Sequence, residues 1–89
     1  METREARLGR LRLRAMRRGT REMDLILGDY SARHLAAMDE AALREWEALL
    51  GEDDHDLLAW ISGMVPAPAG HAALVARIAA GAVGLTAPE

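Results

Sequence analysis

Catalysis or metal binding would require reactive side chains at particular spacings, and the histidines of this sequence lack such a spacing. His34, His55 and His71 have neither a second histidine nor a carboxylate four residues away, as a zinc-protease helix requires. The sequence contains no Cys, which excludes thiolate catalysis, cysteine metal sites and disulfides. We expect His34 on the inner side of a helix, in the core or at its boundary, and the other two histidines in solvent.

Four acidic residues, Glu52, Asp53, Asp54 and Asp56, lie close together but do not follow a metal-binding pattern. They lack the Gly and the distal Glu of a calcium loop, so we interpret them as helix-capping residues. The glycines form no phosphate-binding loop, and no Ser is flanked as in a nucleophile elbow. The sequence therefore favours a protein that is not an enzyme, with no catalytic residues and no metal site.

Residues 17–22, with the sequence Arg-Arg-Gly-Thr-Arg-Glu, are the densest group of side chains suited to protein contacts. Arg18 offers a planar fork of donors for carboxylates or carbonyls, and Gly19 allows another backbone to come close. Glu22 can bind a partner's cation or backbone amides. Spacing alone slightly favours a structural alternative, in which Gly19 only interrupts a helix and Glu22 caps the next one.

Apolar periodicity predicts the helices that position this group. We expect helices over residues 3–18 and 20–36, a third from the cap Asp39 to Leu50, a fourth from residues 53–54 to near Gly63, and a fifth over residues 71–80. The fold class is therefore all-α, a compact antiparallel bundle of about five short helices. The expected core positions are Leu8, Leu11, Ala15, Met23, Ile26, Leu27, Tyr30, Leu43, Trp46, Leu49, Leu50, Leu57, Leu58, Trp60, Ile61, Leu74, Val75 and Ile78.

A chain of 89 residues favours one domain, residues 1–89, with a core over about 5–80 and a frayed tail at 81–89. No apolar run approaches the ~20 residues that span a bilayer, so we expect no membrane insertion. All eleven basic residues are Arg, and the Ala content is high, which suggests a bacterial coding bias. We therefore expect a bacterial, cytoplasmic protein that is a monomer.

The charge is unevenly distributed along the chain. Residues 1–21 contain eight Arg and two Glu, a balance of +6, whereas residues 22–89 contain three Arg and twelve acids, a balance of −9. The basic segment permits nucleic-acid binding as an alternative function. The acidic remainder and the absence of an aromatic stacking platform favour a protein partner instead. An adaptor for an unrelated protein is a further alternative.

The run Arg-Arg-Gly-Thr-Arg-Glu-Met-Asp-Leu at residues 17–25 resembles the RRGxxELD signature of the succinate dehydrogenase assembly factors, the SdhE-type FAD "flavinators". Arg18, Gly19 and Glu22 match its RGxxE core. Residues 53–61 resemble the family's DDPDLxxWL segment, with His55 in place of the usual Pro. Residues 43–50 resemble its third helix, with Trp46 in place of the usual Phe. The similarity covers about residues 5–80.

This resemblance implies a non-catalytic, chaperone-like assembly factor. Such a factor binds the flavoprotein subunit of succinate dehydrogenase, with fumarate reductase as a further candidate client, and promotes covalent attachment of FAD. The FAD belongs to the partner flavoprotein and is not bound stably by the factor. The resemblance assigns partner binding to the turn between the first two helices, with support from the start of the fourth. These residues are Arg17, Arg18, Gly19, Glu22 and Asp24, with Asp56 and Trp60 as supporting residues.

Overall fold

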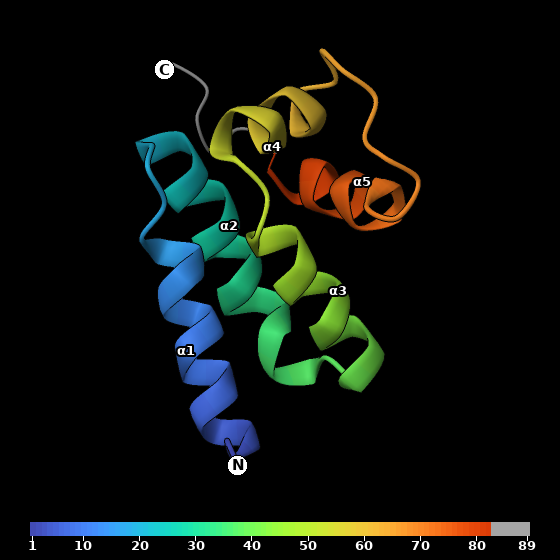
Figure 1. The fold of residues 1–89 in the computed structure, drawn as a ribbon. Helices are drawn as coiled ribbons and strands as arrows, with labels where there is room; N and C mark the ends of the chain where they lie inside the picture. The colour runs from blue at the N-terminus through green and yellow to red at the C-terminus, as the bar shows by residue number, and fades with distance from the viewer. Residues whose placement is uncertain (83–89) are drawn as a thin grey trace.

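The computed structural model describes residues 1–82, which form α-helices joined by short connections, apart from a longer loop at residues 62–71 (Figure 1). The elements are α1 (Arg4–Met16), α2 (Arg21–His34), the 3₁₀ turn η1 (Leu35–Ala37), α3 (Glu40–Leu50), α4 (Asp54–Ile61) and α5 (Ala72–Gly81). Within residues 1–82 there is no strand, and the all-α bundle is confirmed. Of the tail predicted to fray, residues 83–89 lie outside the described residues, and the single-domain assignment stays a prediction.

Side-chain oxygens determine where four of these helices begin. A helix leaves its first N–H groups without intrahelical partners, and a preceding hydroxyl or carboxylate can accept from one of them. The caps are Thr3 for α1, Thr20 for α2, Asp39 for α3 and Asp53 for α4. The predicted caps Asp39 and Asp53 are confirmed. The interpretation of Asp54 as a cap was wrong. Asp54 is the first residue of α4, and its carboxylate binds Arg18 and the Gly19 backbone.

The second helix is shorter than predicted. It ends at His34 rather than at residue 36, and the chain continues as η1. This turn places Leu35 in the core with no exposed surface, although Leu35 was not among the expected core residues. Because Leu35 takes the inner position at this end of α2, His34 is exposed, and its predicted inner position was wrong. Its ring lies beside that of Tyr30, with the centroids 4.4 Å apart.

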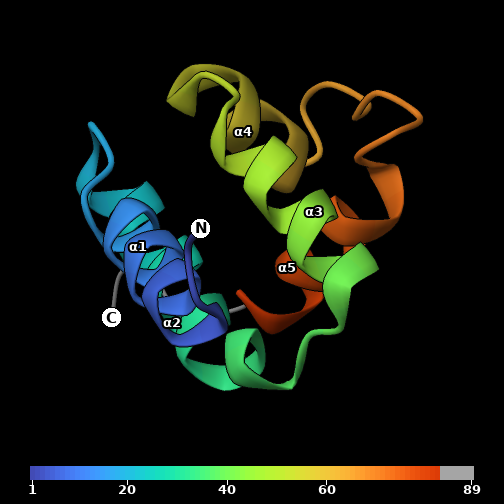
Figure 2. The same ribbon diagram turned by 60° about the horizontal axis from the view of Figure 1, so that its bottom comes forward.

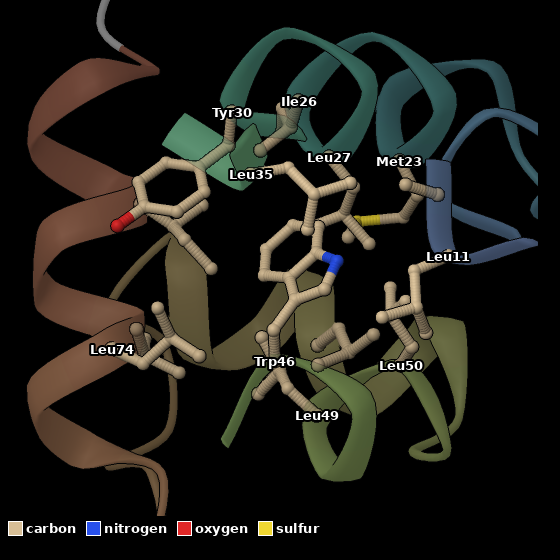
Figure 3. Close-up of a cluster of buried hydrophobic side chains, with 14 of the residues drawn as sticks. Leu11, Met23, Ile26, Leu27, Tyr30, Leu35, Trp46, Leu49, Leu50 and Leu74 are labelled. Carbon is tan, nitrogen blue, oxygen red and sulfur yellow. The ribbon is translucent and has the colours of Figure 1, made fainter. Parts of the chain in front are cut away.

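The helices surround a core of aliphatic side chains with one central indole (Figure 3). Trp46 of α3 is fully buried, and its ring stacks on Tyr30 of α2 at a centroid distance of 5.4 Å. Most of the predicted core positions are buried. Four of them, Leu8, Leu58, Trp60 and Ile61, are only partly buried against the core, because α4 lies at the edge of the bundle and Leu8 is near the start of α1.

Helices α1 and α2 form an antiparallel pair, joined at one end by residues 17–20, which we call the α1–α2 turn. In Figure 2, α3, α4 and α5 all lie on one side of this pair. The arrangement brings the α3–α4 connection, residues 51–53, near the α1–α2 turn although more than thirty residues separate them in sequence. None of the helices within residues 1–82 has both the length and the apolar character needed to cross a membrane.

Candidate functional site at the α1–α2 turn

The Arg18 side chain turns inward from the α1–α2 turn and binds the opposite part of the bundle. Its Nε donates to Asp54 Oδ1 at 2.7 Å, Nη1 to the Leu50 carbonyl at 2.6 Å, and Nη2 to the Glu52 carbonyl at 2.8 Å. The side chain is only 11 % exposed and that of Asp54 only 14 %. A largely buried guanidinium needs a counter-charge and hydrogen-bond acceptors, and this geometry supplies both. Arg18 therefore links the α1–α2 turn to the α3–α4 connection.

Asp54 also contacts the backbone of the glycine that follows Arg18. Its second carboxylate oxygen, Oδ2, accepts from the Gly19 backbone N–H at 2.6 Å. A Cβ at Gly19 would lie 3.1 Å from that oxygen, which is closer than carbon and oxygen normally approach. The Arg18 backbone N–H donates to Asp24 Oδ1 at 2.5 Å. The two carboxylates thus bind the backbone of the turn from α2 and from α4.

The α3–α4 connection is linked in turn to the start of α5. The Glu52 carboxylate lies 2.8 Å from His71 Nε2, and the His71 ring lies 5.8 Å from that of Trp60. The prediction that His71 points into solvent was wrong, because this side chain is only 15 % exposed. His55 is exposed, as predicted. Trp60 is half-buried against the core, so its indole supports the contact between α4 and α5.

The structure divides the residues predicted to bind a partner into two groups. Arg17 and Gly19 in the turn and Glu22 in the first turn of α2 are exposed, whereas Arg18 and Asp24 are largely or partly buried. The Arg18 fork was expected to face a partner, but its three nitrogens donate within the chain. Since Thr20 is the N-cap of α2, Glu22 is the second helical residue rather than the third, and within residues 1–82 its carboxylate makes no capping bond. Binding of another protein by these residues stays a prediction, as does the supporting role of Asp56, which is exposed in the first turn of α4.

Sequence reasoning missed Asp54 as a residue of this site. The interpretation as a cap accounted for both Asp53 and Asp54, although a helix start needs one N-cap. One signal could have identified it. Because Asp53 alone is sufficient to cap the helix, the carboxylate of Asp54 remains available, and the paired arginines of the other motif are candidate partners for it. Within residues 1–82, no group of three His, Cys, Asp or Glu residues is arranged to hold a metal ion.

Three other arginines of the basic segment are also engaged within the chain. Arg4 donates to the carbonyls of Ala36 and Met38 at the end of η1. Arg7 pairs with Glu40 and Glu47, and Arg10 pairs with Glu2 and Glu47.

These ion pairs also lower the pKa values of the carboxylates that take part in them. Hydrogen bonds from Arg10 hold the pKa values of Glu2 and Glu47 below the usual value, and the bond from Arg7 does the same for Glu40. With Arg18 included, four of the eight arginines in residues 1–21 have partners inside the protein. Three of these four, Arg7, Arg10 and Arg18, are paired with carboxylates, so less unbalanced positive charge remains for the nucleic-acid alternative.

An open groove of about 830 Å³ lies beside the α1–α2 turn. One face of α1 forms one wall, and the α3–α4 connection with the start of α4 forms the other. Arg18, Gly19, Thr20 and Asp54 line it between the walls. We call it the turn groove.

Comparison with known proteins relates most of the described chain to one family. A family model described as "Flavinator of succinate dehydrogenase" matches residues 9–82. A protein of Schizosaccharomyces pombe named "Succinate dehydrogenase assembly factor 2, mitochondrial" is 40 % identical over 67 residues, which are 75 % of this chain and 48 % of that protein. A protein of the same name from Mycosarcoma maydis is 37 % identical over 68 residues, 76 % of this chain and 29 % of the relative.

A third relative of that name, from Meyerozyma guilliermondii, is 37 % identical over 59 residues, 66 % of this chain and 44 % of the relative. The chain thus spans about half or less of the length of these relatives. All three are fungal proteins named as mitochondrial. The expectation of a bacterial, cytoplasmic protein is therefore wrong.

Proposed function

Since the chain belongs to the family of flavinators of succinate dehydrogenase, we propose that it docks on the flavoprotein subunit of that enzyme and promotes covalent attachment of its FAD. The family carries a role in assembly rather than in catalysis. To this family role we add the identity of the client subunit, of the flavin and of the docking residues. A fumarate reductase flavoprotein is a second candidate client.

The observation that supports docking is the exposed surface formed by the α1–α2 turn and the first turn of α2. Arg17, Gly19 and Glu22 lie there without side-chain partners within residues 1–82, apart from the bond of the Gly19 backbone to Asp54. Below them, Arg18 and Asp54 hold the turn in position before any partner arrives. A surface that is ordered in advance loses less conformational entropy on binding, so the same contacts give a higher affinity.

The covalent step itself needs no reactive group from this chain. The histidine and the FAD that would become bonded both belong to the flavoprotein, and this chain would supply neither. The role proposed for the turn is to bind one arrangement of the client's domains more tightly than the others, so that histidine and flavin are apposed more often. Moving such an equilibrium from 1:99 to 99:1 requires about 5.5 kcal/mol of differential binding, which a standard protein interface can supply.

The proposed function also limits which molecules the chain itself binds. FAD stays with the client flavoprotein, and the assembly factor binds it neither stably nor catalytically. The factor acts as a monomer and contacts no nucleic acid. It binds the client through protein contacts alone. Asp24 supports the turn and Trp60 supports α4 from within the fold.

Reconstitution with purified components tests this function. The apo-flavoprotein subunit is incubated with FAD in the presence or absence of the chain, and protein-bound flavin is measured by fluorescence after denaturation. We expect the chain to accelerate the appearance of this signal. Gly19→Arg should abolish both binding and acceleration while the helical circular dichroism is retained.

The matched control is Gly9→Arg, because Gly9 is exposed on α1 with open space around it. This variant should bind and accelerate like the wild type. Equal rates of flavin attachment with and without the wild-type chain would refute the proposed function.

A further inference from the structure

The turn groove has one wall with a regular pattern of side chains. Arg10, Leu13, Arg14 and Arg17 occupy positions i, i+3, i+4 and i+7 of α1 and its C-cap, so they share one face of the helix. Leu13 is 48 % exposed, so it presents an aliphatic surface beside these arginines. The groove therefore combines guanidinium groups with an exposed aliphatic side chain.

Most charges of the groove are already balanced by other groups of the protein. Arg18 is paired with Asp54, and Glu52 lies against His71. Asp53 accepts the His55 backbone N–H at the positive end of α4. On the α1 wall, Arg10 binds two carboxylates, Glu2 and Glu47.

Arg14 and Arg17 are different. Both are exposed, and neither has an ion pair or a side-chain hydrogen bond with any part of residues 1–82. They lie on the same side of α1 as Leu13 and line the groove with it. The unbalanced charge of the groove is thus positive and is concentrated on the wall beside the α1–α2 turn.

We propose that the turn groove binds an acidic segment of the client flavoprotein, with carboxylates on Arg14 and Arg17 and an apolar side chain on Leu13. This inference rests on the proposed function and names the chemistry of the client surface. A guanidinium recognises a carboxylate through two parallel N–H donors, and covering Leu13 removes apolar surface from water.

Charge reversal in the groove, compared with charge reversal elsewhere, tests this inference. Affinity for the purified flavoprotein subunit is measured for Arg14→Glu/Arg17→Glu and for the control Arg12→Glu/Arg44→Glu. The control residues are exposed arginines outside the groove, and both double variants change the net charge equally. At about 0.15 M salt, exposed charges farther apart than about 8 Å are largely screened. We expect the groove variant to bind on the order of 100-fold more weakly and the control to stay within about threefold.

Circular dichroism shows whether each variant is folded, and Arg14→Gln/Arg17→Gln provides a second groove variant without reversed charge near the end of α1. This neutral variant should also bind more weakly than the control. Unchanged affinity of both groove variants, with the wild type bound to the subunit, would overturn the inference but not the proposed function. Equal weakening of the groove and control variants would overturn it in the same way.

Titration with FAD alone separates an acidic protein segment from the flavin phosphates. The inference expects no binding of free FAD that depends on Arg14 and Arg17. Binding of FAD by the wild type that is lost in the groove variants would assign the two arginines to the nucleotide and overturn the acidic segment. Failure of the wild type to bind the flavoprotein subunit at all would refute both the proposed function and this inference.

Discussion

Removing the carboxylate of Asp54 should destabilise the whole fold, although the residue lies in a short helix near the surface. Asp54→Ala leaves the Arg18 guanidinium, which is only 11 % exposed, without its counter-charge. It also removes the acceptor of the Gly19 N–H. The carbonyls of Leu50 and Glu52 would still accept from Arg18, so part of its hydrogen bonding survives.

The size of the effect follows from this partial burial. Removing one partner of a buried ion pair typically costs 3–5 kcal/mol, and the two remaining carbonyl bonds place this case at the lower end, at about 3 kcal/mol. For a domain of this size each kcal/mol lowers Tm by about 4–8 °C, so Tm should fall by about 12–24 °C. A small domain has roughly 5–15 kcal/mol of stability in total, so the variant should remain folded at low temperature.

Urea denaturation followed by circular dichroism measures the free energy of unfolding of the variant. The matched control is Asp56→Ala, which removes an exposed carboxylate from the same helical turn. This control loses only its interaction with the helix dipole, about 0.3–1 kcal/mol. If Asp54→Ala and Asp56→Ala unfold at the same urea concentration, the Arg18–Asp54 pair does not hold the turn, and the reasoning about a pre-ordered surface is wrong.

Three further variants test other parts of the structure. Gly19→Ala should lower the free energy of unfolding, measured by urea denaturation, by less than about 1 kcal/mol. The reason is that the Asp54 oxygen can retreat by a few tenths of an ångström and still accept the backbone N–H. A larger loss would show that the contact cannot adjust. Trp46→Phe should lower the free energy of unfolding by less than about 1.5 kcal/mol, far below the ~3–5 kcal/mol expected for Trp46→Ala. The replacement removes an indole N–H that has no partner within residues 1–82, so no hydrogen bond is lost. A loss as large as that of the alanine variant would contradict this. The arginines of α1 lower the folded-state pKa of Glu47 below its ordinary 4.5, so the ionised group contributes stability above pH 4.5 that is lost as the pH falls through the lowered pKa. The urea midpoint of Glu47→Gln should therefore fall less than that of the wild type between about pH 7 and about pH 3, and parallel curves would refute this contribution.

Local sequence patterns were sufficient to predict the helices and most of the core. Asp39 caps a helix because its side chain reaches the N–H groups that follow it, and the apolar spacing from Leu43 to Leu50 places one side of that helix inward. Both effects act over a few residues. His34 and Leu35 show the limit, since the tightening of the chain into η1 changed which of the two side chains entered the core.

The internal bonding of the candidate site could not be predicted in the same way. Arg18 and Asp54 are 36 positions apart, and helical periodicity does not determine which turn meets which connection in a bundle. Spacing grouped Arg17, Gly19 and Glu22 as partner-binding residues, and all three are exposed, but it could not show that Arg18 faces inward. The same limitation hid the pairing of Glu52 with His71.

The covalently bound flavin of the succinate dehydrogenase flavoprotein subunit tests the central claim most directly. It is measured by in-gel fluorescence of the denatured subunit from cells that contain or lack the gene for this chain. We expect the fluorescent band to be lost without the chain while the subunit itself is still present, and the wild-type chain to restore it. A band of equal intensity in cells that lack the chain would refute the proposed role in flavin attachment.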